Sequence, residues 1–511
     1  MKPKLLKIFS TRRTISVLSS SNMFRFIVGL MVFDALWIAL TGLYPMAFDE
    51  DFHFGIIKIY AHHISPFWNS QPEAANSFGA VYRDPSYLYH YLMSFPYRFI
   101  SIFTHDQTIQ VIFLRLINIG SFVWGILIFN RVLSLTKASK ALINSTLLIF
   151  ILIPVIPLLA AHINYDNLIF PLTGLTFLLT LKVTERLRKS KSLKLEEIFG
   201  LAIVLLLSSI VKYAFLPILL VILVYLIINI HRTFPSWITF VGSLKSSWLT
   251  ASIVVRTLLT FAVIFSVGLF SQRYVLNTYL YHTPVPECSK VLNVKACSEY
   301  GPWVRDHNFK QDKPTGTPNF IIFSGNWFYG MWYRLFFSLS GASNHYETRG
   351  TLLFPSVISI GLSVSGIFIT LKYYRRIIGK YNRHALQLFA YVSAAYVFVL
   401  FFDQFRAFSS TGQPVAINGR YLLPVLLPIM LIVGLAFGQL LKSNIRLKVI
   451  FVSITILCML WGGGAITYII RSNDDASWWW PNTYVIRVNR NVKSVLHSVI
   501  PGFYDRGEFF R

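Results

Sequence analysis

Cysteine and acidic residues are both scarce in this 511-residue sequence, which has only 3 Cys and 21 Asp plus Glu. Charged residues of both signs make up 13% of the chain, whereas a water-soluble domain carries about 25%. So few charges cannot cover a soluble surface of this size, and so few cysteines exclude a disulfide-rich miniprotein. The chain is instead 54% hydrophobic and 16% aromatic, which is typical of a polytopic membrane protein.

A net charge of +26 could indicate a nucleic-acid-binding protein, and the positions of the basic residues along the chain decide whether it does. A nucleic-acid groove needs Lys and Arg interleaved with stacking aromatic residues on one soluble face. Here the basic residues concentrate in short segments between apolar stretches, as in the cytoplasmic loops of membrane proteins. The sequence therefore predicts a lipid bilayer as the partner and no nucleic acid.

About eleven apolar stretches approach the roughly 20 residues needed to cross a bilayer. They lie at 23–43, 107–134, 141–161, 168–184, 198–212, 214–230, 252–270, 352–371, 385–403, 421–441 and 449–470. The region 198–230 fits one long tilted helix or a hairpin, and the polar break at Lys212 followed by Pro217 favours the hairpin. We expect an all-α polytopic membrane protein.

The orientation follows from the basic residues. With the N-terminus in the cytoplasm, Lys and Arg are about three times as dense in the cytoplasmic loops as in the outer ones. The apolar run from Phe24 to Leu43 is long for a signal peptide, so we interpret it as an uncleaved first helix. The expected location is the cell membrane, multi-pass, with the N-terminus in the cytoplasm.

Three outer segments are long enough to fold, at 44–106, 271–351 and 471–511. They are rich in Trp and Tyr, which favour the headgroup region, so we expect interfacial helices in the large outer loops. The chain thus divides into a transmembrane domain over 1–470 and a short outer C-terminal tail at 471–511. Cys288 and Cys297 share the second outer loop, where a disulfide is expected.

Two acidic clusters lie at the outer ends of these spans. Asp49, Glu50 and Asp51 are followed by His53, and carboxylates at a membrane boundary are costly unless something uses them. This cluster fits a general base or a divalent-cation site, and it equally fits a solvated loop start. The second cluster, His162 to Asn167, fills a short turn that Asn and Asp caps alone could explain, yet it could meet the first loop.

A third polar element, Asn418 to Pro424, begins the tenth apolar stretch. Its Arg420 could bind phosphate through two parallel hydrogen bonds, with Tyr421 packed against a lipid. Ordinary snorkelling of an arginine at a helix end is the simpler interpretation of the same pattern.

Together these elements resemble the GT-C superfamily of membrane glycosyltransferases, in the branch that includes aminoarabinose and protein O-mannosyl transferases. The acidic motif after the first helix is matched by Asp49-Glu50, with His53 following. Arg83 to Tyr89 resembles the aromatic, proline-containing helix start of the first outer loop. Asn164 to Asp166 and Arg420 to Pro424 match the later motifs.

The resemblance covers roughly residues 20 to 440, and it implies a GT-C-like fold and an inverting transfer. A sugar would pass from a polyprenyl-phosphate donor to a hydroxyl of a lipid, glycan or protein acceptor at the outer face. The candidate residues are Asp49 and then Glu50 for the base; Arg420, Tyr421, Lys212 and Arg83 for the donor phosphate; and His53, Asp166 and Asp51 for the acceptor or a divalent metal ion. Pro85-Ser86 departs from the Pro-Pro often found in the family.

The alternative is a secondary transporter or lipid flippase. Asp34, Arg115 and Lys212 fall within apolar stretches, and ionisable groups inside a membrane often mark transport paths. The chain has no inverted repeat and no paired broken helices, which argues against alternating access. A pairing of Asp34 with Arg115, or of each with neighbouring helices, would explain both charges structurally.

Overall fold

The computed structural model describes residues 11–46, 49–313, 319–336, 353–441, 444–472 and 478–499. These residues are predominantly helical, and they contain no β-strand apart from one isolated bridge between Gly42 and Trp479. The expectation of an all-α chain is therefore confirmed for the described part of the protein.

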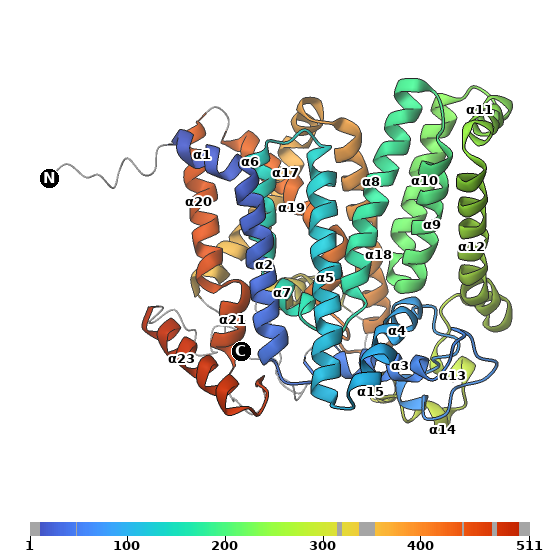
Figure 1. The fold of residues 1–511 in the computed structure, drawn as a ribbon. Helices are drawn as coiled ribbons and strands as arrows, with labels where there is room; N and C mark the ends of the chain where they lie inside the picture. The colour runs from blue at the N-terminus through green and yellow to red at the C-terminus, as the bar shows by residue number, and fades with distance from the viewer. Residues whose placement is uncertain are drawn as a thin grey trace.

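Long helices stand side by side in one bundle (Figure 1). They are α2 (Ser21–Thr41), α5 (Gln107–Ser134), α6 (Lys140–Leu152), α8 (Asp166–Ser190), α9 (Leu195–Val211), α10 (Leu216–Thr233), α12 (Ile253–Tyr281), α17 (Leu353–Lys380), α18 (Arg383–Thr411), α19 (Leu423–Leu440) and α20 (Ile445–Gly462). Within the described ranges, nine helical segments are long and apolar enough to cross a membrane, while α6 and α9 are shorter. The fold is that of a multi-pass membrane protein, and eleven crossings stay a prediction.

Local sequence signals explain where several helices begin and end. Ser20 and Asp106 accept hydrogen bonds from backbone N–H groups in the first turns of α2 and α5, which satisfies donors that have no partner inside the helix. Pro217 stands in the first turn of α10, where a missing N–H costs nothing. Between α9 and α10, Lys212 has extended backbone and is followed by η3 (Tyr213–Phe215). The region 198–230 is thus two helices, as its polar break predicted.

The elements of the loops predicted to be outer, with α21 at the end of the last apolar stretch beside them, gather at one end of the bundle, the lower end in Figure 1. They are α3 (Glu50–Ala61), η2 (Asn76–Phe78), α4 (Leu88–Phe103), α13 (Cys288–Val291), α14 (Val294–Cys297), α15 (Gly301–Gln311), α21 (Gly464–Arg471) and α23 (Thr483–Val499). At the opposite end lie α1 (Thr11–Ser19) and α11 (Trp237–Thr250). Cys288 and Cys297 form the expected disulfide. Residues 314–318 and 337–352 of the second outer loop lie outside the described ranges.

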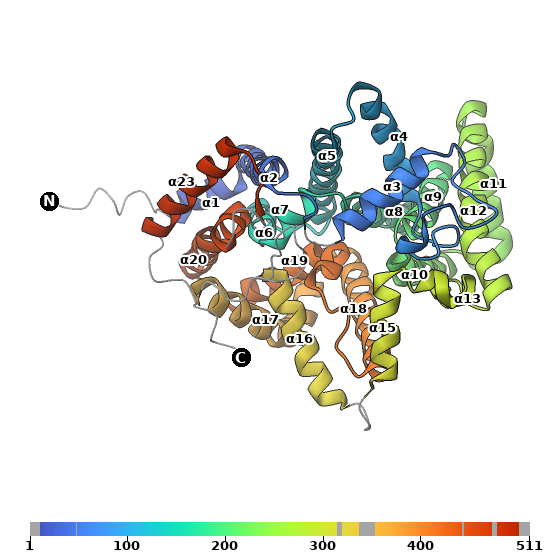
Figure 2. The ribbon, with the colours of Figure 1, turned by 90° about the horizontal axis from the view of Figure 1, so that it is seen from below.

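The C-terminal segment packs against the first long helix, and Figure 2 shows α23 beside α2. The backbone N–H of Leu43 donates to the carbonyl of Trp478 at 3.0 Å, and that of Trp480 donates to Thr41, also at 3.0 Å. The Trp37 indole N–H donates to Asn489 of α23 at 3.0 Å. The described part of the predicted tail is therefore built into the same packed unit as α2.

Asp34 and Arg115 do not pair with each other; each contacts a neighbouring element instead, which is the second of the two pairings that the sequence left open. The Asp34 carboxylate instead accepts a hydrogen bond from the backbone N–H of Ala465, at the break between α20 and α21. Gly464 makes this approach possible, because its φ is +56° and a Cβ there would lie 2.3 Å from Asp34 Oδ2. The partner of Arg115 is Glu50, from the first outer loop.

The orientation of the bundle can be tested by labelling introduced cysteines, in a Cys458→Ser background that keeps the disulfide. Ser77 and Ser190 are both exposed and lie in segments predicted to be outer and cytoplasmic. An impermeant maleimide applied to intact cells should label Ser77→Cys only, and permeabilised cells should show both. Labelling of Ser190→Cys on intact cells would reverse the orientation.

Candidate active site

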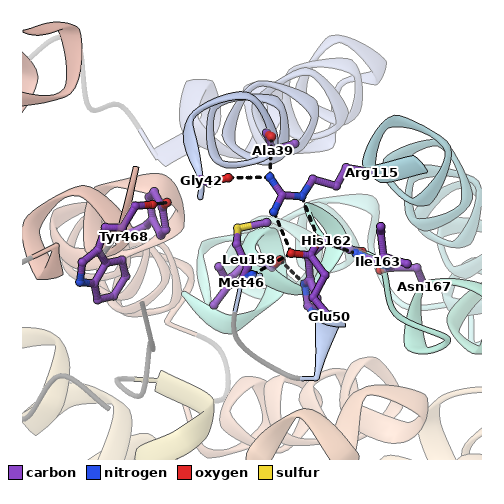
Figure 3. A network of polar contacts seen from close by, with 11 residues as sticks. Ala39, Gly42, Met46, Glu50, Arg115, Leu158, His162, Ile163, Asn167 and Tyr468 are labelled. Atoms are coloured by element: carbon purple, nitrogen blue, oxygen red, sulfur yellow. Dashed lines mark hydrogen bonds and ion pairs between the residues drawn. The ribbon is translucent and has the colours of Figure 1, made fainter. Parts of the chain in front are cut away.

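A buried ion pair between Glu50 and Arg115 anchors the site (Figure 3). Both side chains are fully buried, and the guanidinium meets the carboxylate through two parallel hydrogen bonds, Nε to Oε1 at 2.9 Å and Nη2 to Oε2 at 2.7 Å. The carboxylate also accepts from the backbone N–H groups of Met46, at 2.7 Å, and Ile163, at 3.1 Å. Every lone-pair direction of the buried charge is thereby used, which is the condition for such a pair to be tolerated.

The remaining contacts of Arg115 bring distant segments together. Its Nη1 donates to the carbonyls of Ala39, at 3.0 Å, and Gly42, at 2.6 Å, at the end of α2. Its guanidinium carbon lies 5.7 Å from the ring centroid of Trp480 in the C-terminal segment. The pair therefore fixes α2, α3, α5 and the turn after α7 (Val155–Ala160) relative to one another.

The protonation state of Glu50 follows from this environment. Burial alone would raise its pKa, but the charge and hydrogen bonds of Arg115, helped by the Met46 N–H, hold the pKa of Glu50 below its ordinary value. Glu50 is therefore ionised and has no oxygen directed at a substrate. This arrangement favours a structural role for Glu50 over the secondary role as base that the sequence suggested.

The turn from His162 to Asn167 meets the first outer loop, as its shortness suggested. Asn167 donates to the carbonyls of Leu159 and His162, each at 2.9 Å, and the Asn164 side chain accepts from the Asp166 N–H at 2.8 Å. The two asparagines shape the turn, which leaves the Asp166 side chain for another partner.

That partner is Lys212, whose Nζ lies 2.5 Å from Asp166 Oδ1. Both groups are buried, and the ammonium also lies over the rings of Tyr165, at 4.5 Å, and Tyr421, at 5.1 Å from the centroids. The extended backbone at Lys212, between α9 and α10, brings the ammonium group to Asp166, the first residue of α8. A cation between a carboxylate and two aromatic faces is well stabilised.

Arg420 forms the second cation of the cluster. Its Nη2 donates to Asp49 Oδ2 at 2.8 Å, and its guanidinium carbon lies 5.3 Å from the ring of Tyr421. The two partners differ in exposure: 6% of the Arg420 side chain is accessible, against 63% of the Asp49 side chain. Asp49 has left-handed backbone with φ 66° immediately before α3, so the locked Glu50 fixes where Asp49 emerges. An exposed carboxylate thus covers a buried guanidinium.

A buried histidine pair lies on the far side of Tyr165. His53 Nδ1 and His90 Nε2 are 2.8 Å apart, and the His53 ring lies 4.6 Å from the Tyr165 ring, centroid to centroid. Burial lowers the pKa of His90 to about 3, and burial together with the charges of His90 and Arg420 holds the pKa of His53 well below its ordinary value. Both imidazoles are therefore neutral.

The structure thus connects most of the sequence candidates through direct contacts. Sequence reasoning did not assign Tyr165, His90 or Arg115 to the site. Only their contacts in the folded structure distinguish these three residues from an ordinary aromatic residue, an ordinary helical histidine and an arginine that snorkels at a helix end. Asp51 is exposed on the first turn of α3. Arg83 stacks on Tyr82 at 5.0 Å, and no contact among the described residues joins it to Arg420.

The carboxylates and histidines of the site face cations or each other rather than a shared metal position. In the described part of the chain, no group of three or more His, Cys, Asp or Glu side chains is arranged to hold a metal ion. Asp49 and Asp166 have Arg420 and Lys212 as partners instead. The predicted divalent metal ion stays a prediction.

An apolar cavity of about 770 Å³ lies between α1, α6, α16 (Phe320–Phe336), α17, α19 and α20. It follows α19 from Leu422 at the site end to Leu441 at the other end of the helix. Leu422 closes η4 (Gly419–Leu422), which also carries Arg420. The cavity therefore begins two residues from the buried guanidinium.

Comparison with protein-family models, curated proteins and solved structures found no match to this chain. The resemblance to the GT-C superfamily accordingly stays a prediction from the motifs described above.

Replacing Glu50 by Gln should destabilise the protein by about 3–5 kcal/mol, because it leaves the Arg115 charge buried without a counter-charge. Thermal unfolding in detergent measures this, and Asp51→Asn, an exposed change in the same turn, is the matched control. An unchanged melting temperature for Glu50→Gln would contradict an anchoring role.

The same pair predicts a pH dependence of stability. Because the folded-state pKa of Glu50 is lowered, its contribution is complete above the unfolded-state pKa of about 4.3 and is lost as the pH falls through the folded value. Glu50→Gln should lack this part of the acid destabilisation that the parent shows. Identical acid profiles for the two proteins would contradict the assignment.

Proposed function

We propose that this protein is a membrane glycosyltransferase that moves a sugar from a polyprenyl-phosphate donor to an acceptor hydroxyl at the outer face of the cell membrane. The observation that carries the proposal is the buried Arg420 guanidinium, covered by the exposed Asp49 carboxylate, with a long apolar cavity that is lined by Leu422, two residues further along the chain. A phosphate attached to an apolar chain matches both halves of this arrangement. The motif resemblance to the GT-C superfamily agrees with it.

The phosphate would bind where Asp49 now contacts Arg420. Arg forms charge-assisted bonds with phosphate oxygens, and the nearby Lys212 adds a second positive charge beside Tyr421. The two cations are at present balanced by Asp49 and Asp166. An incoming anion competes with Asp49, because Asp49 is the exposed partner, whereas Asp166 is enclosed.

When the donor phosphate displaces Asp49 from Arg420, the Asp49 carboxylate becomes available as the base of the reaction. The freed Asp49 carboxylate accepts the proton of the acceptor hydroxyl as that oxygen bonds to the anomeric carbon. The bond from the anomeric carbon to the phosphate oxygen breaks on the opposite side, which inverts the centre. The electron pair stays on the polyprenyl phosphate, whose charge Arg420 stabilises. The exposure of Asp49 lets its proton return to water.

The apolar cavity suits the lipid part of the donor. Its lining along α19 runs parallel to the long helices, as an isoprenoid chain in a bilayer would. The phosphate end of such a chain would come out next to Leu422 and therefore next to Arg420. Burial of the chain provides affinity in proportion to the apolar area removed from water.

The transporter or flippase alternative loses its main motivation. Each of the intramembrane charges that suggested it has a structural partner: Arg115 pairs with Glu50, Lys212 with Asp166, and Asp34 with the Ala465 N–H. A relay or substrate path needs groups that change partners during transport.

Replacing Asp49 by Asn should separate binding from chemistry. Farnesyl phosphate, a soluble prenyl phosphate, should bind more tightly, because no carboxylate competes for Arg420. Transfer from a panel of radiolabelled polyprenyl-phosphate sugars should fall by about 10²- to 10⁴-fold, the usual effect of losing a positioned base. Asp51→Asn controls for the same charge change nearby. Weaker farnesyl phosphate binding with parental transfer would refute both roles.

Arg420→Ala should weaken farnesyl phosphate binding strongly, and Arg420→Lys should restore only part of it, since an ammonium cannot make two parallel bonds. Binding is measured by fluorescence titration of the full-length protein in nanodiscs. Arg305→Ala, at an exposed arginine paired with Asp306, is the control. If both Arg420 variants bind like the parent, the phosphate site lies elsewhere.

A further inference from the structure

We infer that His53 and Asp166 form a recognition site for the hydroxyl groups of a neutral sugar, with His90 as the residue that positions His53. The inference rests on the proposed function, because the sugar is taken to be the one attached to the donor phosphate. It goes beyond that function by assigning the class of sugar and a residue that the motifs do not include.

The hydrogen bonds of the histidine pair determine which ring nitrogen of His53 is available. The backbone carbonyl of Ser86 lies beside His90 and raises its pKa against the effect of burial, so it favours an N–H on the ring nitrogen next to it, while the other nitrogen, Nε2, faces His53. A neutral His90 that donates to Ser86 must accept at Nε2, so His53 donates from Nδ1. His53 Nε2 is then the lone-pair acceptor of the ring.

Asp166 provides a second acceptor of the same kind. Its Oδ1 is taken by Lys212, whereas its Oδ2 is buried and has no hydrogen-bond partner among the described residues. A buried carboxylate oxygen without a donor costs free energy, so a ligand that supplies one is favoured. Tyr165 links the two acceptor residues, because its ring contacts His53 and also lies under Lys212, the partner of Asp166.

The surrounding charges decide what kind of donor fits. Arg420 and Lys212 both contribute positive potential at His53, and Asp166 is already neutralised by Lys212. A metal ion or an ammonium group would be repelled by these two cations. A hydroxyl brings hydrogen-bond donors without charge, and a sugar bonded to a phosphate on Arg420 would present several within reach. The site therefore suits a neutral sugar, with any amino group absent or acylated.

The inference can be tested on full-length protein in nanodiscs with farnesyl phosphodiesters that carry equal charge. Farnesyl methyl phosphate reports phosphate and chain binding alone. Its glucosyl, galactosyl, mannosyl and N-acetylglucosaminyl counterparts add a neutral sugar, and the glucosaminyl one adds an ammonium. At least one neutral sugar should bind more tightly than the methyl diester, and the ammonium sugar should not.

His53→Phe keeps an aromatic ring but removes the acceptor. It should bind the best neutral-sugar diester about 3- to 10-fold more weakly, the effect of one lost hydrogen bond, and the methyl diester unchanged. His62→Phe, the same change at an exposed histidine of the first loop, is the matched control. Equal loss for both diesters would mean a structural role and would overturn the inference.

The outcomes separate this inference from the proposed function. If the methyl diester does not bind through Arg420, the proposed function fails. If it binds but no neutral sugar adds affinity, or the ammonium sugar binds best, only the hydroxyl site fails. A free methyl glycoside that binds in a His53-dependent manner beside farnesyl phosphate would assign the site to the acceptor and overturn the donor assignment.

The positioning role of His90 has its own spectroscopic signature. Nitrogen-15 NMR of histidine-labelled protein should show His53 protonated at Nδ1 in the parent. His90→Leu removes the acceptor and should shift His53 towards the Nε2-protonated tautomer, with the same loss of sugar affinity as His53→Phe. An unchanged His53 tautomer in that variant would remove His90 from the proposal.

Discussion

The buried ion pair between Glu50 and Arg115 is the constraint on which the rest of the site depends. It is the point where α2, α3, α5 and the His162 turn are tied together by hydrogen bonds to one carboxylate and one guanidinium. The helix that Glu50 begins then fixes its neighbours by geometry: Asp49, just before, points outward, and His53, one turn later, points inward. A costly buried ion pair thus sets the positions of two residues, one exposed and one buried.

The two cations of the site differ in how exposed their carboxylate partners are. Lys212 and Arg420 each have one carboxylate partner, but Asp166 is enclosed and Asp49 is exposed. The enclosed pair keeps its geometry because separating it would leave two charges without solvent. The exposed partner can exchange for another anion at little cost, since water solvates it when released. The same chemistry of pairing therefore gives one permanent contact and one replaceable contact.

Much of this could be predicted from the sequence, for reasons that differ between residues. The helical architecture could be predicted because it depends on features of nearby residues. These are the apolar stretches, the polar break at Lys212 and the aromatic residues concentrated in the long loops. That Asp49, Asp166 and Arg420 share one site was suggested by their position at the same ends of the helices. The sequence did not reveal that Glu50 is buried in an ion pair while Asp49 is exposed, because this difference depends on Arg115, which is 65 residues distant from Glu50. His90 carries no local signal, and Tyr165 lies within the Asn164–Asp166 motif without a feature of its own that marks it.

The docking of the C-terminal segment on α2 also has a consequence for how the protein is made. Trp478 and Trp480 bond to the backbone beside Gly42, and Trp480 covers Arg115. The ribosome delivers these residues long after α2 and α5 have entered the membrane. Until then the Arg115 guanidinium lacks part of its cover, so the ion pair reaches its final environment only after Trp480 has been synthesised. Membrane insertion and completion of the site are therefore separate events in time, and a chain that stalls late would be inserted yet unfinished.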